Sequence, residues 1–145
     1  MAYTRFFDPK LHFAYTLCTG IIDDHQLLIY IMSFHTETKD DEFIRELVDV
    51  RPLHNLDKLT ARGLVSISDK HKKLFAGKDF KRAVLNRPGD FNRVSGIYAS
   101  LVSDGFQMRS FDGNIEEPLA WLGYGQKEIG KLKRFIDDHS KDRFV

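Results

Sequence analysis

The sequence has little cysteine and no long apolar run. Its single cysteine, Cys18, cannot form a disulfide within the chain, and so low a count is typical of proteins in a reducing compartment. The longest apolar run, residues 27–32, is far too short to span a bilayer, and residues 1–10 lack the apolar stretch of a signal peptide. We therefore expect a cytoplasmic protein with no integral membrane segment.

No sign of charge dominates the sequence. The 22 Lys and Arg side chains nearly balance the 21 Asp and Glu side chains, and the formal net charge is +1. A chain without a strong positive field is not expected to bind nucleic acid.

The motifs of common catalytic and metal sites are also missing. The six histidines show no metal-ligand spacing such as HExxH, and the GxSxG, P-loop and GxGxxG patterns are absent. Cys18 has no base beside it in the sequence and is interpreted as a small buried residue. His71 falls on an apolar helix face, which favours a hydrogen-bonded core histidine over a ligand. We predict no metal, no cofactor and no catalytic residue.

Apolar and aromatic residues are plentiful by comparison. They make up 42% and 12% of the chain, with 12 Phe and one Trp. A chain of 145 residues with this composition is long enough to bury a core without disulfides or metals. We predict one soluble domain over residues 1–145, with a core built on aromatic side chains.

Strand and helix patterns alternate along the chain. Residues 1–19 are predicted to form an antiparallel hairpin, and residues 126–145 to carry an additional C-terminal helix. The predicted order, ββαβαβαβα plus that helix, indicates an α/β fold with a mixed, mostly parallel five-stranded sheet. The expected strands are residues 3–7, 12–18, 43–50, 80–85 and 106–111, and the expected helices are residues 24–35, 60–74, 91–102, 114–122 and 126–139.

The rest of the chain is organised around residues 43–60, FIRELVDVRPLHNLDKLT. The first half is typical of a strand that ends at Asp49, and residues 36–42 before it are expected to be a polar loop. Pro52 has no N–H to donate, so we expect strand pairing to stop there and residues 53–59 to be a crossing segment. Thr60 is a good N-cap for the next helix. Open α/β sheets usually place their sites where a strand ends before a helix begins.

The element order and this stretch resemble the STAS or SpoIIAA-like fold of bacterial anti-sigma-factor antagonists. In that family a strand ends in an aspartate, and eight residues later an Asp-Ser pair opens a helix. Asp49 and Asp57 match the two aspartates, while Lys58 stands at the position of the phosphorylated serine. The resemblance covers residues 7–122 and is greatest to small SpoIIAA-like bacterial proteins of unknown role. Those proteins share an Asp-Pro hairpin, a strand end like residues 47–49 (LVD) and a motif like residues 120–123 (AWLG).

The resemblance implies a function as well as a fold. It implies a non-enzymatic STAS-like binding or regulatory module that acts through protein–protein contacts. A lysine has no hydroxyl to accept a phosphoryl group, so Lys58 removes the phosphoserine switch from that expectation. Thr60 is better explained as a helix cap.

Five polar residues are candidate binding residues. Asp49, Asp57 and Lys58 could converge on a polar ligand or a partner; alternatively, the two aspartates only bond to backbone N–H groups at turns. Asn86 and Arg87 follow the next strand, and with free N–H groups of the following helix they could hold an anion. The alternative for that segment is a plain turn.

Three further hypotheses belong to other classes. Sec14-like lipid carriers have a related sheet, so the chain could be a carrier or sensor of a small apolar or lipid ligand. An enzyme could use Asp49, Asp57 and Lys58 as an acid–base set. The last helix has a basic face, which is interpreted as solvated, and its apolar stripe could instead complete a homodimer. The basic residues are Lys127, Lys131, Lys133, Arg134 and Lys141.

Overall fold

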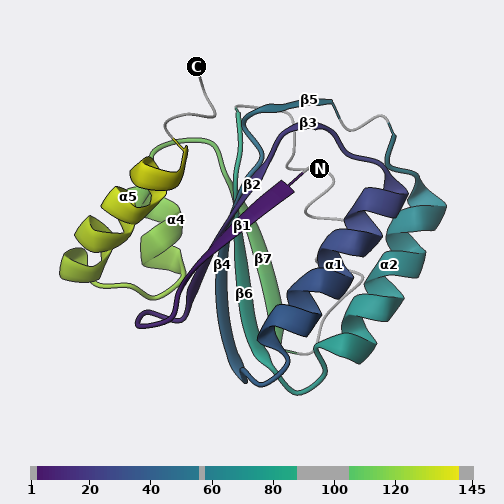
Figure 1. Ribbon diagram of the computed structural model, residues 1–145, viewed down its shortest axis with the longest axis horizontal. Helices are drawn as coiled ribbons and strands as arrows, with labels where there is room; N and C mark the ends of the chain where they lie inside the picture. Colours follow the sequence, from purple (N-terminus) through teal and green to yellow (C-terminus); the bar gives the residue numbers. More distant parts are fainter. Residues whose placement is uncertain (1–2, 56–57, 88–104, 141–145) are drawn as a thin grey trace.

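A mixed β-sheet with helices on both faces forms the molecule, for which the computed structural model describes residues 3–55, 58–87 and 105–140 (Figure 1). Within these residues five strands lie in the order β1-β2-β4-β6-β7. β1 and β2 are antiparallel and the other neighbours are parallel, which confirms the predicted mixed sheet with an N-terminal hairpin. The bounds are β1 (Tyr3–Asp8), β2 (Phe13–Cys18), β4 (Phe43–Asp49), β6 (Asp79–Leu85) and β7 (Phe106–Phe111).

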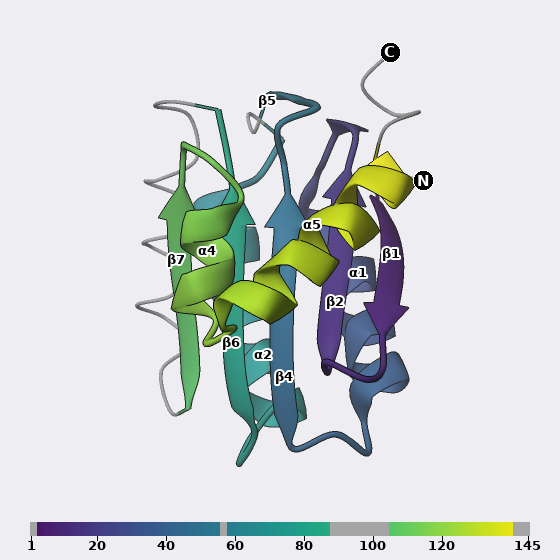
Figure 2. The same cartoon turned by 90° about the vertical axis from the view of Figure 1, so that its left-hand side faces the viewer.

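Two pairs of helices cover the sheet. α1 (Asp24–Thr38) and α2 (Ala61–Leu74) lie side by side on one face, and α4 (Glu116–Trp121) and α5 (Gln126–Ser140) cross the other (Figures 1 and 2). α1 begins where the Asp23 carboxylate accepts a hydrogen bond from the backbone N–H of Gln26, and α2 where Thr60 accepts one from Gly63. The Thr60 cap was expected from the sequence.

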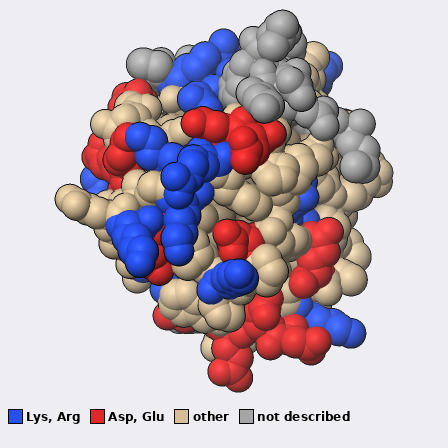
Figure 3. Space-filling view, turned by 60° about the vertical axis from the view of Figure 1, so that its left-hand side comes forward, with Lys and Arg blue, Asp and Glu red and all other residues tan. Residues whose placement is uncertain are grey.

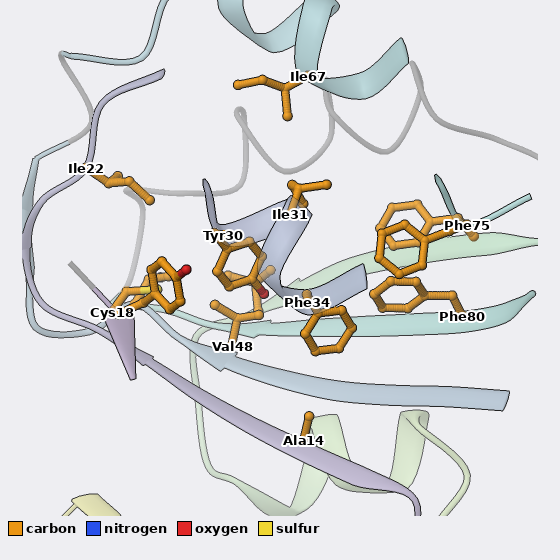
Figure 4. Packing of buried hydrophobic residues seen from close by; sticks show 14 of the residues in the cluster. Ala14, Cys18, Ile22, Tyr30, Ile31, Phe34, Val48, Ile67, Phe75 and Phe80 are labelled. Carbon is orange, nitrogen blue, oxygen red and sulfur yellow. The ribbon is translucent and has the colours of Figure 1, made fainter. Parts of the chain in front are cut away.

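The core between the sheet and α1 and α2 is rich in aromatic rings, as predicted (Figure 4). Phe34 of α1 stacks on Phe80 of β6 at 5.5 Å between ring centroids, and Phe80 meets Phe75 edge-on at 5.1 Å. His71 of α2 is fully buried among these rings. Burial, followed by the charge of Arg82, lowers the pKa of His71 to about 2, so this core histidine is neutral.

A second core lies between the sheet and α5. Three alternating residues of β2, Phe13, Tyr15 and Leu17, all point into it. Leu132 and Ile136 of α5 are fully buried against them. The suggestion that the apolar stripe of α5 completes a homodimer is therefore wrong, because the stripe covers the chain's own sheet.

A two-stranded sheet was missed. β3 (Gly20–Ile21) pairs in parallel with β5 (Leu53–Asn55), where the sequence predicted only a strand end and a crossing segment. Pro52 removes one N–H donor, but Leu53 N donates to Val50 O at 3.0 Å and closes a turn, after which pairing resumes. The chain thus forms backbone bonds directly beyond the end of β4.

The predicted loop over residues 36–42 begins too early, because α1 continues to Thr38. Thr36 and Thr38 keep their hydroxyls within the helix, donating to Met32 O at 3.1 Å and Phe34 O at 2.7 Å. The side chain of Lys78 then donates to Thr38 O and Lys39 O, which satisfies carbonyls at the helix end. The predicted helix over residues 91–102, like Asp57, lies outside the described residues.

Candidate functional site

Asp49 lies at the carboxyl end of β4 and is fully buried. Its Oδ1 accepts hydrogen bonds from Arg51 N at 3.2 Å and Arg51 Nε at 2.9 Å, and its Oδ2 accepts from Arg51 Nη2 at 2.7 Å and the Tyr15 hydroxyl at 2.8 Å. Four donors therefore surround one carboxylate. This bidentate ion pair fixes the chain as it turns out of β4.

The two side chains that bond to Asp49 have shifted pKa values. Burial, then the charge of Asp49, raises the pKa of Tyr15, and the hydrogen bond to Asp49 raises the pKa of Arg51. Tyr15 therefore remains a neutral donor and Arg51 a cation. The three side chains form one hydrogen-bonded group that holds the end of β4.

Asn86 and Arg87 follow the end of β6, one strand away. Asp49 and Leu85 are register partners, so Asn86 lies at the same sheet edge as Asp49. Asn86 is buried; its N–H donates to Phe111 O at 2.8 Å, while within the described residues its Nδ2 makes no hydrogen bond. Arg87 Nη2 donates to Leu53 O at 2.6 Å, which ties the end of β6 to β5.

The five predicted binding residues do not all meet. Asp49, Asn86 and Arg87 share the carboxyl edge of the sheet. Lys58 is exposed just before α2, whereas Asp49 is fully buried and bonded to Tyr15 and Arg51. Asp57 lies outside the described residues.

A buried charge network in the middle of the sheet was missed. Glu46 of β4 and Arg82 of β6 are register partners, and Arg82 Nε donates to Glu46 Oε1 at 2.6 Å. Glu46 Oε2 accepts from Thr16 Oγ1 at 2.7 Å and from the Tyr30 hydroxyl. The sequence does carry a signal for this pair, because an acidic and a basic residue lie among apolar neighbours in the two strands.

Glu46 is an ionised carboxylate inside the protein. Burial alone would raise the pKa of Glu46, but the charges of Arg82 and Arg5 and the hydrogen bonds from Tyr30 and Arg82 outweigh it and hold this pKa below its ordinary value. Tyr30 is fully buried, and burial raises its pKa well above the ordinary value. The network thus pairs a fixed negative charge with fixed positive charges.

A small apolar cavity lies over this network, with Cys18, Tyr30 and Arg82 among its lining residues and Leu64 and Met108 facing them. Its volume is about 70 Å³. Burial, followed by the charges of Glu46 and Asp49, raises the pKa of Cys18 to about 12. Cys18 is therefore a buried, protonated thiol, as its sequence context indicated, and not an activated nucleophile.

The outer face of α5 carries charges of both signs. Lys127, Lys131 and Arg134 are exposed, while Lys133 pairs with Glu116 of α4. Figure 3 shows Lys and Arg side chains beside Asp and Glu side chains on this side of the molecule. Lys141 lies outside the described residues. The arrangement matches a solvated face.

Within the described residues, no group of three or more His, Cys, Asp or Glu side chains is placed to hold a metal ion. None of the described helices is long and apolar enough to cross a membrane.

Comparisons with known proteins find similarity to solved structures. No protein-family model matches the sequence, and no curated protein matches it. A solved structure from Shewanella loihica PV-4, an uncharacterised protein of the DUF3478 family with a SpoIIAA-like fold, matches with a TM-score of 0.54. The match covers 83% of this chain and 92% of that chain at 14% identity.

The fold is SpoIIAA-like. At 14% identity the match shows the fold alone, and it agrees with the SpoIIAA-like fold predicted from the element order. A SpoIIAA-like fold places the ends of β4 and β6 at one edge, where Asp49, Asn86 and Arg87 are found.

Proposed function

We propose that the protein is a non-enzymatic binding module of SpoIIAA-like fold that acts through contacts with another protein. The observation that carries this proposal is the saturation of Asp49, whose two oxygens accept four hydrogen bonds from Tyr15 and Arg51. A carboxylate held in this way shapes a surface, whereas a general acid or base has to exchange a proton with a substrate.

The module works without a phosphoserine switch. Lys58 stands where the SpoIIAA-like proteins that are switched carry their serine. The nearby hydroxyl of Thr60 accepts from Gly63 N at 2.9 Å and donates to Asp24 Oδ2 at 2.6 Å, so it is committed to holding α2 against α1. Binding is therefore controlled by the partner's abundance or affinity and not by phosphorylation at this position.

The cavity beside Cys18 favours a second candidate, the carrier or sensor of a small apolar ligand. Its walls are almost entirely aliphatic, which suits such a ligand. The volume of about 70 Å³ is, however, about half of the ~150 Å³ that accommodates benzene in an engineered protein cavity. A lipid would require the walls to move apart, so we rank this function second.

Native mass spectrometry of the protein isolated from its own cells tests the proposal. We expect a species that carries a second, different polypeptide. A small added mass on every molecule would favour the carrier instead. Turnover of a small substrate that is lost on changing Asp49→Asn would contradict both functions.

A further inference from the structure

A second concave surface lies at the opposite end of the sheet from Asp49. Its lining residues come from the β1–β2 hairpin, the last turn of α1 and the start of β4. Figure 2 shows these three segments at the same end of the sheet. This hairpin groove has a volume of about 420 Å³, about six times that of the cavity beside Cys18. The residues used below are Phe7, Asp8, His12, Glu37, Asp41 and Phe43, which all line it.

The walls of the hairpin groove are aromatic and exposed. Phe7 and Phe43 are 41% and 45% exposed, although large apolar side chains are usually buried. His12 stands edge-on to Phe43 at 6.2 Å between ring centroids, and its φ of 51° lies in the left-handed region that non-glycine residues seldom adopt. The hairpin thus holds a strained conformation that places a third ring at the groove.

The rim of the groove is acidic. Asp8, Glu37 and Asp41 line it, and residues 37–42 (ETKDDE) carry four carboxylates and one lysine. The cation that lines the groove, Arg45, is 6% exposed and pairs with Asp79 at 3.1 Å. An exposed aromatic surface with a negative rim is complementary to a positively charged group.

The chain itself already binds guanidinium groups in this way. The Arg45 guanidinium lies 3.8 Å from the centroid of the Phe43 ring, and Phe43 is still 45% exposed. Arg5 lies 4.4 Å from the centroid of Phe34 and pairs with Glu37. These two internal contacts show which side chain the aromatic and acidic groups of the groove accommodate.

We propose that the hairpin groove binds a basic segment of a partner protein, with an arginine or lysine side chain on the exposed rings of Phe7 and Phe43 and its charge near Asp8 and Asp41. This inference rests on the proposed function as a protein-binding module and adds the place and the chemistry of the partner. Because the groove lies at the amino ends of the parallel strands, it is separate from the predicted residues at their carboxyl ends.

Nuclear magnetic resonance titration of the full chain with acetyl-Arg-Leu-Arg-amide tests the inference. We expect amide shifts concentrated at residues 7–13 and 37–45, and little response to acetyl-Glu-Leu-Glu-amide. Phe43→Ser and Asp41→Lys should each weaken binding by about two- to fivefold, as loss of one exposed cation–π or ion-pair contact implies. Val65→Ser, which removes an equally exposed apolar side chain (47%) on α2, is the matched control and should leave binding unchanged.

Several results would contradict the proposal that the hairpin groove binds a basic segment. These are shifts spread over other acidic surfaces, equal binding of the acidic peptide, or binding unaffected by both groove variants. Shifts of the same size with tetramethylammonium alone would make it a small-cation site. A polypeptide in the native mass spectrum that Phe43→Ser retains as well as the unaltered chain does would reject the groove and leave the proposed function standing. Bare protein in that spectrum would count against the proposed function itself.

Discussion

At the scale of single residues, Glu46 is a carboxylate in the middle of the sheet that accepts hydrogen bonds from three side chains, Thr16, Tyr30 and Arg82. It is fully buried, yet it is charged, because Arg82 lies directly opposite on the neighbouring strand. Thr16 and Tyr30 satisfy its second oxygen. A buried ion pair of this kind is not expected to add net stability, but breaking one half of it is costly.

We therefore expect Glu46→Ala to lower the free energy of unfolding by about 3–5 kcal/mol, because it leaves the Arg82 charge buried without its carboxylate. Urea unfolding at pH 7 measures this. The double variant Glu46→Leu with Arg82→Met should recover most of the loss. Glu116→Ala, which breaks the exposed pair with Lys133, should leave the midpoint nearly unchanged. Equal losses of unfolding free energy in Glu46→Ala and Glu116→Ala would show that the buried pair matters no more to stability than the exposed one.

His71 gives the protein a specific acid sensitivity. Its pKa is about 2 in the folded chain and about 6.5 when unfolded, so between these values the unfolded state binds the extra proton. Stability should be unaffected above pH 6.5 and fall as the pH drops below it, by at most about 1.4 kcal/mol per pH unit. His71→Leu should flatten the curve from pH 6.5 to 4.5, and His25→Leu, at an exposed site, should not. Parallel curves for the unaltered chain and His71→Leu would contradict this.

At the scale of elements, the contact between α1 and α2 depends on a glycine. A Cβ on Gly63 would lie 2.2 Å from the Asp24 carboxylate, which is held by Thr60 N at 2.9 Å and Thr60 Oγ1 at 2.6 Å. The close approach of the two helices therefore needs a residue without a side chain at this position.

Alanine at two helical glycines should have opposite effects. Gly63→Ala should destabilise the protein by about 1–3 kcal/mol, because Asp24 has to leave its bonds to Thr60. Gly130→Ala in α5 should stabilise it by about 1 kcal/mol, since nothing lies within 4 Å of the added methyl group and alanine favours a helix. Thermal unfolding of both variants measures the difference. Stabilisation by both would mean that the α1–α2 contact is loose.

The elements were predictable where the signal was local. Caps such as Asp23 and Thr60 and the period of the apolar residues lie within a few positions of one another in the sequence. β3 and β5 could not be predicted, because strands of two and three residues carry no period and exist through their pairing. The sequence places the end of α1 too early, because residues 36–42 are polar and polar stretches are typical of loops. Thr38 is nevertheless buried and bonded within the helix.

At the scale of the whole molecule, α5 is part of the fold rather than an appendage. It covers a face of the sheet that would otherwise expose Phe13, Tyr15 and Leu17. Leu132→Ala should cost about 2–5 kcal/mol by leaving a cavity in this second core. Lys131→Ala, one residue away on the exposed side, should cost little. If Leu132→Ala were equally mild, α5 would be only loosely attached to the sheet.

The candidate sites show the same limit on a larger scale. Asp49 was found from the sequence because it ends a strand, but its saturation by Tyr15 depends on a residue 34 positions away. The hairpin groove joins residues 7–14 to residues 34–45, segments that no local pattern connects. The charge balance of the whole chain hid its acidic rim, because +1 overall says nothing of how the charges are distributed.

The most direct test of the central claim, that this chain works by binding another protein, is photo-crosslinking in its own cells. A photoreactive phenylalanine analogue would replace Phe43 in the hairpin groove or Val65 on α2, two positions of similar exposure. We expect the analogue at position 43 to form a cross-link to one polypeptide, which mass spectrometry should map to a segment rich in Lys and Arg. The analogue at position 65 should form no cross-link to that segment. Folded protein that gives no polypeptide cross-link from either position would contradict the claim.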